Sequence, residues 1–141
     1  MSAHDLNITL LQTDRVWQGP ADNRAAFGKL TSKYAGSSDL IVLPELVTNG
    51  FTMNPTEHSE APNGATSVRL SQQAREQAVT PCGSLIIRDH QYYFNRLLWV
   101  TPDGTTAHYD KRHLFRMAGE DQHYAKNDTT LEKAAEILCK I

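Results

Sequence analysis

The sequence predicts an α/β fold in which a mixed β-sheet is flanked by helices. A strand-like segment, a helical segment and a second strand-like segment follow one another between residues 6 and 43, which is the order of a βαβ unit. The run 40–43 (LIVL) is continuously apolar, as in strands that are covered on both faces. Residues 82–109 alternate strand-like segments with short turns, a pattern typical of antiparallel neighbours.

The N-terminal elements follow from composition and spacing. Residues 6–12 (LNITLLQ) are apolar and carry β-branched residues, so we expect a strand there. Residues 20–35 fit a helix, because Pro20 suits a first helical turn and apolar residues recur at helical spacing up to Gly36. Residues 48–55 carry loop signals, and the polar segment 57–64 is expected to be irregular.

The middle of the chain combines one helix with three strands. Residues 65–78 predict an exposed helix with an incomplete apolar stripe formed by Val68, Leu70, Ala74 and Ala78. The predicted strands are 82–88, 92–100 and 105–109, joined by a tight connection at 89–90 and a Thr-Pro-Asp-Gly turn at 101–104.

The C-terminal residues have a different character. Residues 129–138 predict a helix, because Thr129 and Glu132 have the spacing of a capping box and apolar residues follow at i, i+3, i+4 and i+7. We therefore expect one domain over residues 1–125 and a separate helical tail over residues 126–141.

Composition excludes several classes of protein. The chain has 141 residues, with 14 Lys and Arg against 16 Asp and Glu, for a net charge of −2. That balance gives no basic patch for nucleic acid, and no apolar run approaches the roughly 20 residues that span a bilayer. The N-terminus lacks the pattern of a signal peptide, and two cysteines make no disulfide framework. We expect a cytoplasmic protein with reduced thiols.

Two charged residues follow strand-like segments far apart in the sequence. Glu45 comes just after the apolar run 40–43, and Lys111 comes just after the segment that ends at Tyr109. Side chains at strand ends can converge on one cleft of an α/β fold. Taken separately, each is equally well explained as a solvated surface charge, and the same holds for Glu120 beside Asp121.

The segments LPELVTNGF (43–51) and YDKRHLF (109–115) resemble the motifs of the nitrilase (carbon–nitrogen hydrolase) superfamily, in particular its ω-amidase-like branch. This resemblance covers about residues 7–124. It implies that Glu45 is a general base and that Lys111 stabilises an oxyanion. It also implies that Glu120, in MAGED (117–121), is the second carboxylate beside them. The chemistry implied is amide hydrolysis through a cysteine thioester, which requires no metal and no organic cofactor.

The same branch implies a small-molecule amide substrate, the terminal amide of a dicarboxylate monoamide such as 2-oxoglutaramate or succinamate. Arg112 or Arg116 could pair with the far carboxylate of this substrate, or each could be a solvated surface charge. His108 and His113 lack the spacing of a zinc site, and we expect a structural role for His113.

The thioester chemistry implied by the resemblance also requires a cysteine nucleophile. In the superfamily it lies on a tight elbow in a Cys-Tyr-Asp or Cys-Glu-like block, and this sequence contains no such block. Cys82 precedes the lysine, at a position that the superfamily does not use, and is expected to be a small core residue. Cys139 follows Lys111 by 139 − 111 = 28 residues and is the candidate nucleophile, although it falls near the end of the predicted tail helix.

Members of the superfamily are roughly twice as long and form a four-layer α-β-β-α sandwich. The resemblance therefore implies half of such a sandwich, truncated before the nucleophile. A sheet face without its cover would expose a large apolar surface, so we expect a homo-oligomer. The alternative to an active amidase is a catalytically inactive half-domain that acts only through self-association or by pairing with a homologue.

Overall fold

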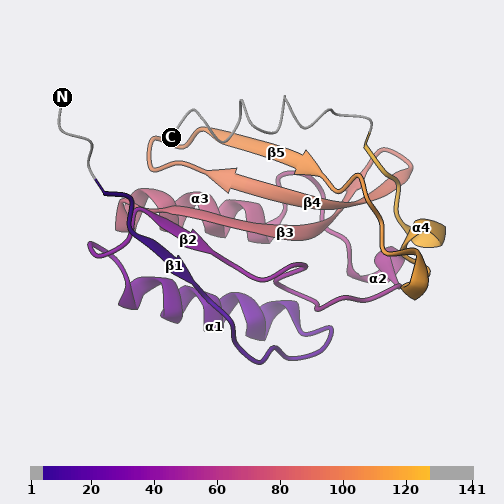
Figure 1. Ribbon diagram of the computed structural model, residues 1–141, viewed down its shortest axis with the longest axis horizontal. Coiled ribbons are helices and arrows are strands. Elements are labelled where there is room, and N and C mark those ends of the chain that lie inside the picture. Colours follow the sequence, from indigo (N-terminus) through magenta and orange to yellow (C-terminus); the bar gives the residue numbers. More distant parts are fainter. Residues whose placement is uncertain (1–4, 128–141) are drawn as a thin grey trace.

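The computed structural model describes residues 5–127. In this range a five-stranded sheet carries two long helices (Figure 1). In chain order the elements are β1 (Ile8–Leu10), α1 (Pro20–Lys33), β2 (Leu40–Val42), α2 (Pro55–His58), α3 (Ala65–Gln77), β3 (Thr80–Asp89), β4 (Tyr92–Val100), β5 (Thr106–Asp110), a 3-10 turn (Arg116–Ala118) and α4 (Glu120–His123).

The sheet is mixed, and its strands have the same order in space as in the sequence. β1, β2 and β3 pair in parallel, whereas β4 and β5 continue antiparallel. Parallel neighbours need a crossover connection, and α1 and α3 lie in the two crossovers. The predicted α/β class with a mixed sheet flanked by helices is confirmed.

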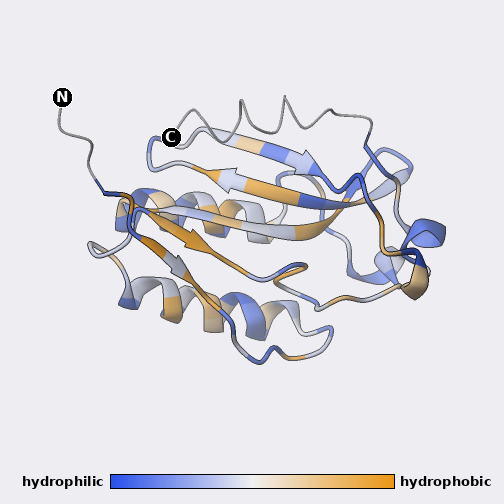
Figure 2. Ribbon diagram, in the orientation of Figure 1, coloured by the Kyte–Doolittle hydropathy of each residue, from blue (hydrophilic) through white to orange (hydrophobic). Residues whose placement is uncertain are grey.

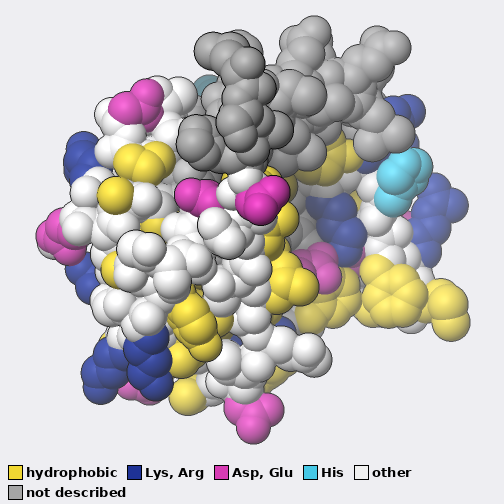
Figure 3. All heavy atoms as spheres, turned by 60° about the vertical axis from the view of Figure 1, so that its left-hand side comes forward, with side chains coloured by type: hydrophobic (Ala, Val, Ile, Leu, Met, Phe, Trp, Pro, Cys, Tyr) yellow, Lys and Arg dark blue, Asp and Glu magenta, His cyan; other side chains and the backbone are white. Residues whose placement is uncertain are grey.

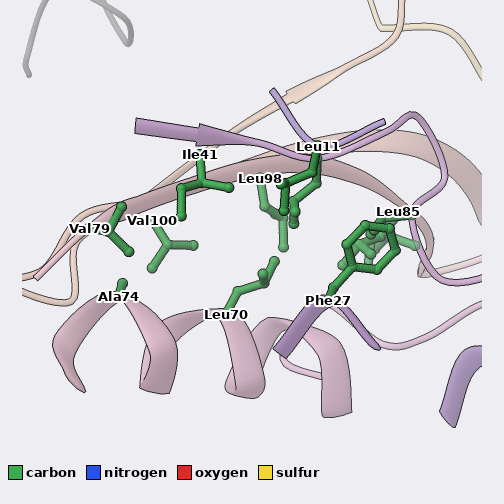
Figure 4. Packing of buried hydrophobic residues seen from close by; sticks show 12 residues of the cluster. Leu11, Phe27, Ile41, Leu70, Ala74, Val79, Leu85, Leu98 and Val100 are labelled. Atoms are coloured by element: carbon green, nitrogen blue, oxygen red, sulfur yellow. The ribbon is translucent and has the colours of Figure 1, made fainter. Parts of the chain in front are cut away.

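The main core lies between the two long helices and one face of the sheet. Figure 4 shows Leu70 and Ala74 of α3 pointing toward Ile41 and Leu98 of the strands. Side chains alternate between the two faces of a strand, so every second strand residue joins this layer. The buried cluster consists of Leu11, Phe27, Ile41, Leu43, Val47, Leu70, Ala74, Val79, Leu85, Ile87, Leu98 and Val100.

The predicted strands and the two long helices are confirmed, with shifted ends. The predicted stripe of α3 is partly wrong, because Val68 is 59% exposed and the polar Thr66 and Gln73 are buried in the helix interface. Buried polar groups need hydrogen-bond partners. Gln73 Nε2 donates to Thr31 Oγ1 at 2.5 Å, and Thr66 N donates to Glu60 Oε2 at 2.8 Å.

Two short helices were not predicted. Residues 57–64 were expected to be irregular, but α2 extends to His58, and α4 begins at Glu120. Each has only four residues, too few for an apolar period, and such short helices depend on tertiary contacts. The predicted tail helix at 129–138, and Cys139 with it, lie outside the described residues, so the boundary between residues 125 and 126 stays a prediction.

The sheet face opposite α1 and α3, which we call the open face, is also apolar. Cys82 and Trp99 are cross-strand partners there, and Leu40 packs with them in a second cluster. Ile8 and Leu10 occupy the same face of β1 and are 52% and 73% exposed. Figure 2 shows how hydrophobic residues concentrate on the strands. None of the helices within residues 5–127 is long and apolar enough to cross a bilayer.

Candidate active site

Glu45 lies in a tight turn that follows β2. The next residue, Leu46, has a φ of +46°, a left-handed conformation that costs a non-glycine residue about 1–2 kcal/mol. The turn is fixed by β3, because Leu46 N donates to Ser84 Oγ at 2.8 Å and Val47 N donates to Ser84 O at 2.9 Å. Backbone strain of this kind gathers at functional sites.

Lys111 directly follows β5. Its backbone N–H donates to the carbonyl oxygen of Asn95 at 2.9 Å. The preceding residue, Asp110, accepts two hydrogen bonds from the guanidinium of Arg96, at 2.6 and 2.9 Å. This buried bidentate pair joins β4 to the end of β5, so the position from which the lysine side chain starts is rigid.

The structure brings Glu45, Lys111 and Glu120 together. Lys111 Nζ is 2.7 Å from Glu45 Oε1 and 2.9 Å from Glu120 Oε2. The three side chains differ in exposure: 48% for Glu45, 27% for Lys111 and 0% for Glu120. An ammonium therefore lies between a buried carboxylate and a solvent-accessible one.

Lys111 remains charged at neutral pH. Burial disfavours its ammonium form, but hydrogen bonds to Glu45 and Glu120 outweigh that cost and raise the pKa of Lys111 above its ordinary value. The Nζ atom also lies 5.1 Å from the centre of the Phe51 ring, where the π face attracts a cation. A lysine has three N–H donors, so one is left for a ligand once both carboxylates are bound.

Every acceptor atom of the buried Glu120 is occupied. Its Oε2 accepts from Lys111 Nζ and from the backbone N–H of Phe115, which is 2.6 Å away. Its Oε1 accepts from Asn95 Nδ2 at 3.1 Å. A buried carboxylate requires such partners, and described residues engage both oxygens of this one.

An open hollow of about 300 Å³ adjoins Glu45 and Lys111 on the open face. Figure 3 shows acidic and basic side chains next to each other among exposed hydrophobic side chains on one side of the molecule. The hollow is lined by Leu43, Glu45, Ser84, Asn95, Leu97, Tyr109 and Lys111. A small polar substrate held against an apolar wall would fit such a space.

Arg112 and Arg116 do not join the three charged residues. Both are exposed and line a second hollow of about 340 Å³, which also includes His113, Asp121 and Lys126. His113 is exposed, and segment 112–117 runs over the surface apart from the half-buried Leu114. The structural role expected for His113, by packing or hydrogen bonding near the site, stays a prediction. Arg112, which follows Lys111, and Asp121, which follows Glu120, both line the second hollow. Because Lys111 lines the first hollow, the two hollows border the same short segment of the chain.

Of the two cysteines, only Cys82 lies in the described residues. It is buried against Leu40 and Trp99, as expected for a small core residue. Burial raises the pKa of the Cys82 thiol to about 11, so at neutral pH it stays protonated and is a poor nucleophile. The structure gives no account of Cys139.

Sequence reasoning gave no role to Asn95, although the resemblance places it where the family has an Asn. Its Nδ2 donates to Glu45 Oε1 at 2.7 Å as well as to Glu120. The alternation of β4 places Asn95 on the same face as Leu97 and Trp99, so a polar residue in an otherwise apolar series was the available signal. The bidentate partners Arg96 and Asp110 left no comparable signal, because their pairing depends on strand register.

Comparisons with known proteins agree with this geometry. The model of the carbon-nitrogen hydrolase family matches residues 9–135. The omega-amidase YafV of Yersinia enterocolitica is 40% identical over 119 residues, 84% of this chain and 46% of that protein. Omega-amidase YafV of Escherichia coli K12 is 39% identical over 119 residues, which again cover 84% of this chain and 46% of that protein. The chain thus spans about half the length of the curated relatives that it matches.

Solved structures give the same picture. A CN-hydrolase superfamily protein from Xanthomonas campestris, with an arsenic adduct in its active site, superposes with a TM-score of 0.87 at 42% identity, over 90% of this chain and 48% of that one. An amidase from Nesterenkonia sp. AN1 has a TM-score of 0.78 at 18% identity, over 89% and 51% of the two chains, which shows the shared fold alone. Because the family model matches most of its length, the chain belongs to the carbon-nitrogen hydrolase family.

Proposed function

We propose that this chain hydrolyses the terminal amide of small dicarboxylate monoamides to a carboxylate and ammonia. The observation that carries the proposal is the ammonium of Lys111, held between Glu45 and Glu120 at the edge of an open hollow. A fixed cation beside a carboxylate supplies the oxyanion partner and the general base that amide hydrolysis requires. Glu120 keeps the lysine charged and oriented.

The role of Glu45 follows from the hydrogen bonds of its two carboxylate oxygens. Within the described residues, Glu45 Oε1 accepts hydrogen bonds from Lys111 and Asn95, and Oε2 accepts none. Oε2 therefore takes the proton of the attacking thiol and passes it to the departing ammonia. The thiolate forms a thioester as the C–N bond breaks. A water molecule, deprotonated by the same oxygen, then releases the carboxylate and restores the thiol.

We assign Cys139 as the nucleophile. The alternative, Cys82, is buried with a pKa of about 11. It lies on β3 within an apolar cluster, where no substrate can approach its sulfur. A working thiol must also stay reduced, which fits the cytoplasmic location expected from the sequence. The mechanism uses no metal or organic cofactor.

The substrate class rests on the relatives named omega-amidase and on the second hollow. Arg112, Arg116 and Lys126 give this hollow three basic groups against the single carboxylate of Asp121. Asp121 is only loosely engaged, with an Oδ2 atom 3.9 Å from Arg116 Nε. A guanidinium binds a planar carboxylate well, so the far carboxylate of 2-oxoglutaramate or succinamate would lie here.

The purified chain is expected to release ammonia from succinamate and 2-oxoglutaramate far faster than from butyramide, which matches succinamate in length but has no carboxylate. Arg116→Gln should raise KM for succinamate about 10-fold, the equivalent of one charge-assisted hydrogen bond, with kcat unchanged. Arg75→Gln, on the surface of α3, is the matched control. Absence of ammonia from every amide, with a folded chain, would refute the proposed activity.

A specific observation also favours a second candidate, an inactive half-domain that self-associates. The open face carries the exposed side chains of Ile8 and Leu10 on β1, which is an edge strand. Edge strands with exposed apolar residues readily bind another chain, and a second copy presents the same surface. We propose that two copies meet through this face.

Sedimentation velocity at micromolar concentration is expected to show a dimer. Leu10→Asp should shift it to a monomer, because a charge on the buried face of the interface would be desolvated. Val68→Asp, at an exposed apolar position on α3, should leave the dimer unchanged. A clean monomer of the unmodified chain would contradict this assembly.

A further inference from the structure

One side chain contacts both carboxylates of the site. Asn95, on β4 and 2% exposed, places its Nδ2 atom 2.7 Å from Glu45 Oε1 and 3.1 Å from Glu120 Oε1. Its backbone carbonyl accepts the N–H of Lys111 at 2.9 Å. Asn95 is thus bonded to each of the three charged residues, although they lie far apart in the sequence.

The orientation of the Asn95 amide follows from its neighbours. An amide group presents an oxygen acceptor at one end and two N–H donors at the other. Carboxylates that bind an ammonium are ionised and accept only, so an amide oxygen in this position would face two acceptors and repel both. The donor end must point at Glu45 and Glu120, and both of its N–H groups are used.

These two donations make the carboxylates unequal. Glu120 uses Oε1 for Asn95 and Oε2 for Lys111 and Phe115, so both of its oxygens are engaged. Glu45 uses Oε1 for Asn95 and Lys111, which leaves Oε2 without a hydrogen bond in the described part of the chain. If Asn95 released either group, both carboxylates could rotate about the same ammonium and compete for it.

We infer that Asn95 is a positioning residue that determines which of the two carboxylates acts as the base, an inference that rests on the proposed function of the site. By holding Glu45 through Oε1, it aims Oε2 at the hollow. By holding Glu120 through Oε1, it reserves Oε2 for Lys111. Asn95 lines the same hollow, but both N–H groups of its side chain are used by the two carboxylates and it transfers no proton.

Two substitutions at this position test the inference. Asn95→Leu keeps the branched shape of the side chain but removes both donors. The two carboxylates then lose their fixed orientation, and with it they support the Lys111 ammonium less well. Asn95→Asp keeps the shape, removes the donors and adds a negative charge next to the ammonium. The titration of Lys111, followed by NMR of the isotope-labelled side chain, needs no turnover and reports both effects directly.

The pKa of Lys111 is expected to move down in Asn95→Leu and up in Asn95→Asp, whereas kcat for succinamate falls by about 100-fold in both, as for a misplaced catalytic group. KM should change little. A residue that only fills space would leave the lysine titration of the folded Asn95→Leu variant unchanged, and that result would overturn the inference. If Asn95→Leu does not fold, the isosteric Asn95→Asp variant decides by its kcat, and an unchanged kcat in that folded variant would overturn the inference.

The two readouts also separate this inference from the proposed function. If the unmodified chain shows no turnover, the amidase activity is disproved. The positioning role is retained in that case if the pKa of Lys111 still moves down in Asn95→Leu and up in Asn95→Asp. Turnover that survives both substitutions would remove the positioning role and leave the amidase activity intact. Asn7→Leu, at an exposed position before β1, serves as the matched control for both measurements.

Discussion

Lys111→Met is expected to lower ammonia release from succinamate by about 100- to 1,000-fold, the usual effect of removing one oxyanion donor. Methionine has nearly the length of lysine but no charge, so the third N–H of the ammonium is lost together with its hold on both carboxylates. The measurement is kcat at saturating succinamate. A variant that keeps more than about a tenth of the turnover would contradict the oxyanion role.

The controls separate chemistry from folding. Lys29→Met, at an exposed position of α1, removes the same charge far from the site and should leave turnover unchanged. Lys111→Arg retains a cation between the carboxylates but not the shape of the ammonium, so the fold should persist while turnover still falls. In the same assay Cys139→Ala should stop turnover, whereas Cys82→Ala should not.

Glu120→Gln is expected to destabilise the fold by about 3 kcal/mol, as when one partner of a buried ion pair is removed. The carboxylate is fully buried and accepts from Lys111, Asn95 and Phe115 N. An amide offers one oxygen in place of two, so at least one buried donor loses its acceptor and the ammonium loses a counter-charge. The free energy of unfolding is measured by urea denaturation at neutral pH.

Glu45→Gln provides the contrast, because Glu45 bonds to the same lysine but is half exposed. It should change the unfolding free energy by less than about 1 kcal/mol, yet abolish ammonia release because the base is gone. Asp121→Asn, next to Glu120 and exposed, should leave the unfolding free energy nearly unchanged. If Glu120→Gln proves as stable as Asp121→Asn, the buried carboxylate has no structural role.

The charge of Lys111 also makes the stability of the folded chain depend on pH. Its pKa in the folded chain is raised, so its charge adds stability that is present at neutral pH and is lost only as the pH rises through that folded value. All comparisons at neutral pH therefore report a fully protonated lysine.

The sequence alone was sufficient for the regular elements. The apolar run before Glu45, the helical spacing after Pro20 and the strand–turn–strand pattern before Lys111 each reflect local periodicity, which is set by backbone geometry. The segments 43–51 and 109–115 then pointed to the family through their resemblance to its motifs. Short elements such as α2 and α4 lack a period and escaped prediction.

Only the tertiary structure decided the burial and the contacts of the charged residues. The resemblance implied different roles for Glu45, Lys111, Glu120 and Arg112, but the sequence pattern alone showed each only as a charge near a strand end or loop. Strand register and the turn at residues 112–120 bury Glu120, leave Glu45 accessible and turn Arg112 into a separate hollow. Asn95 joins the two carboxylates only because β4 lies between β3 and β5. Local periodicity determines the elements of this chain, whereas hydrogen bonds between residues distant in sequence exist only once the sheet has formed.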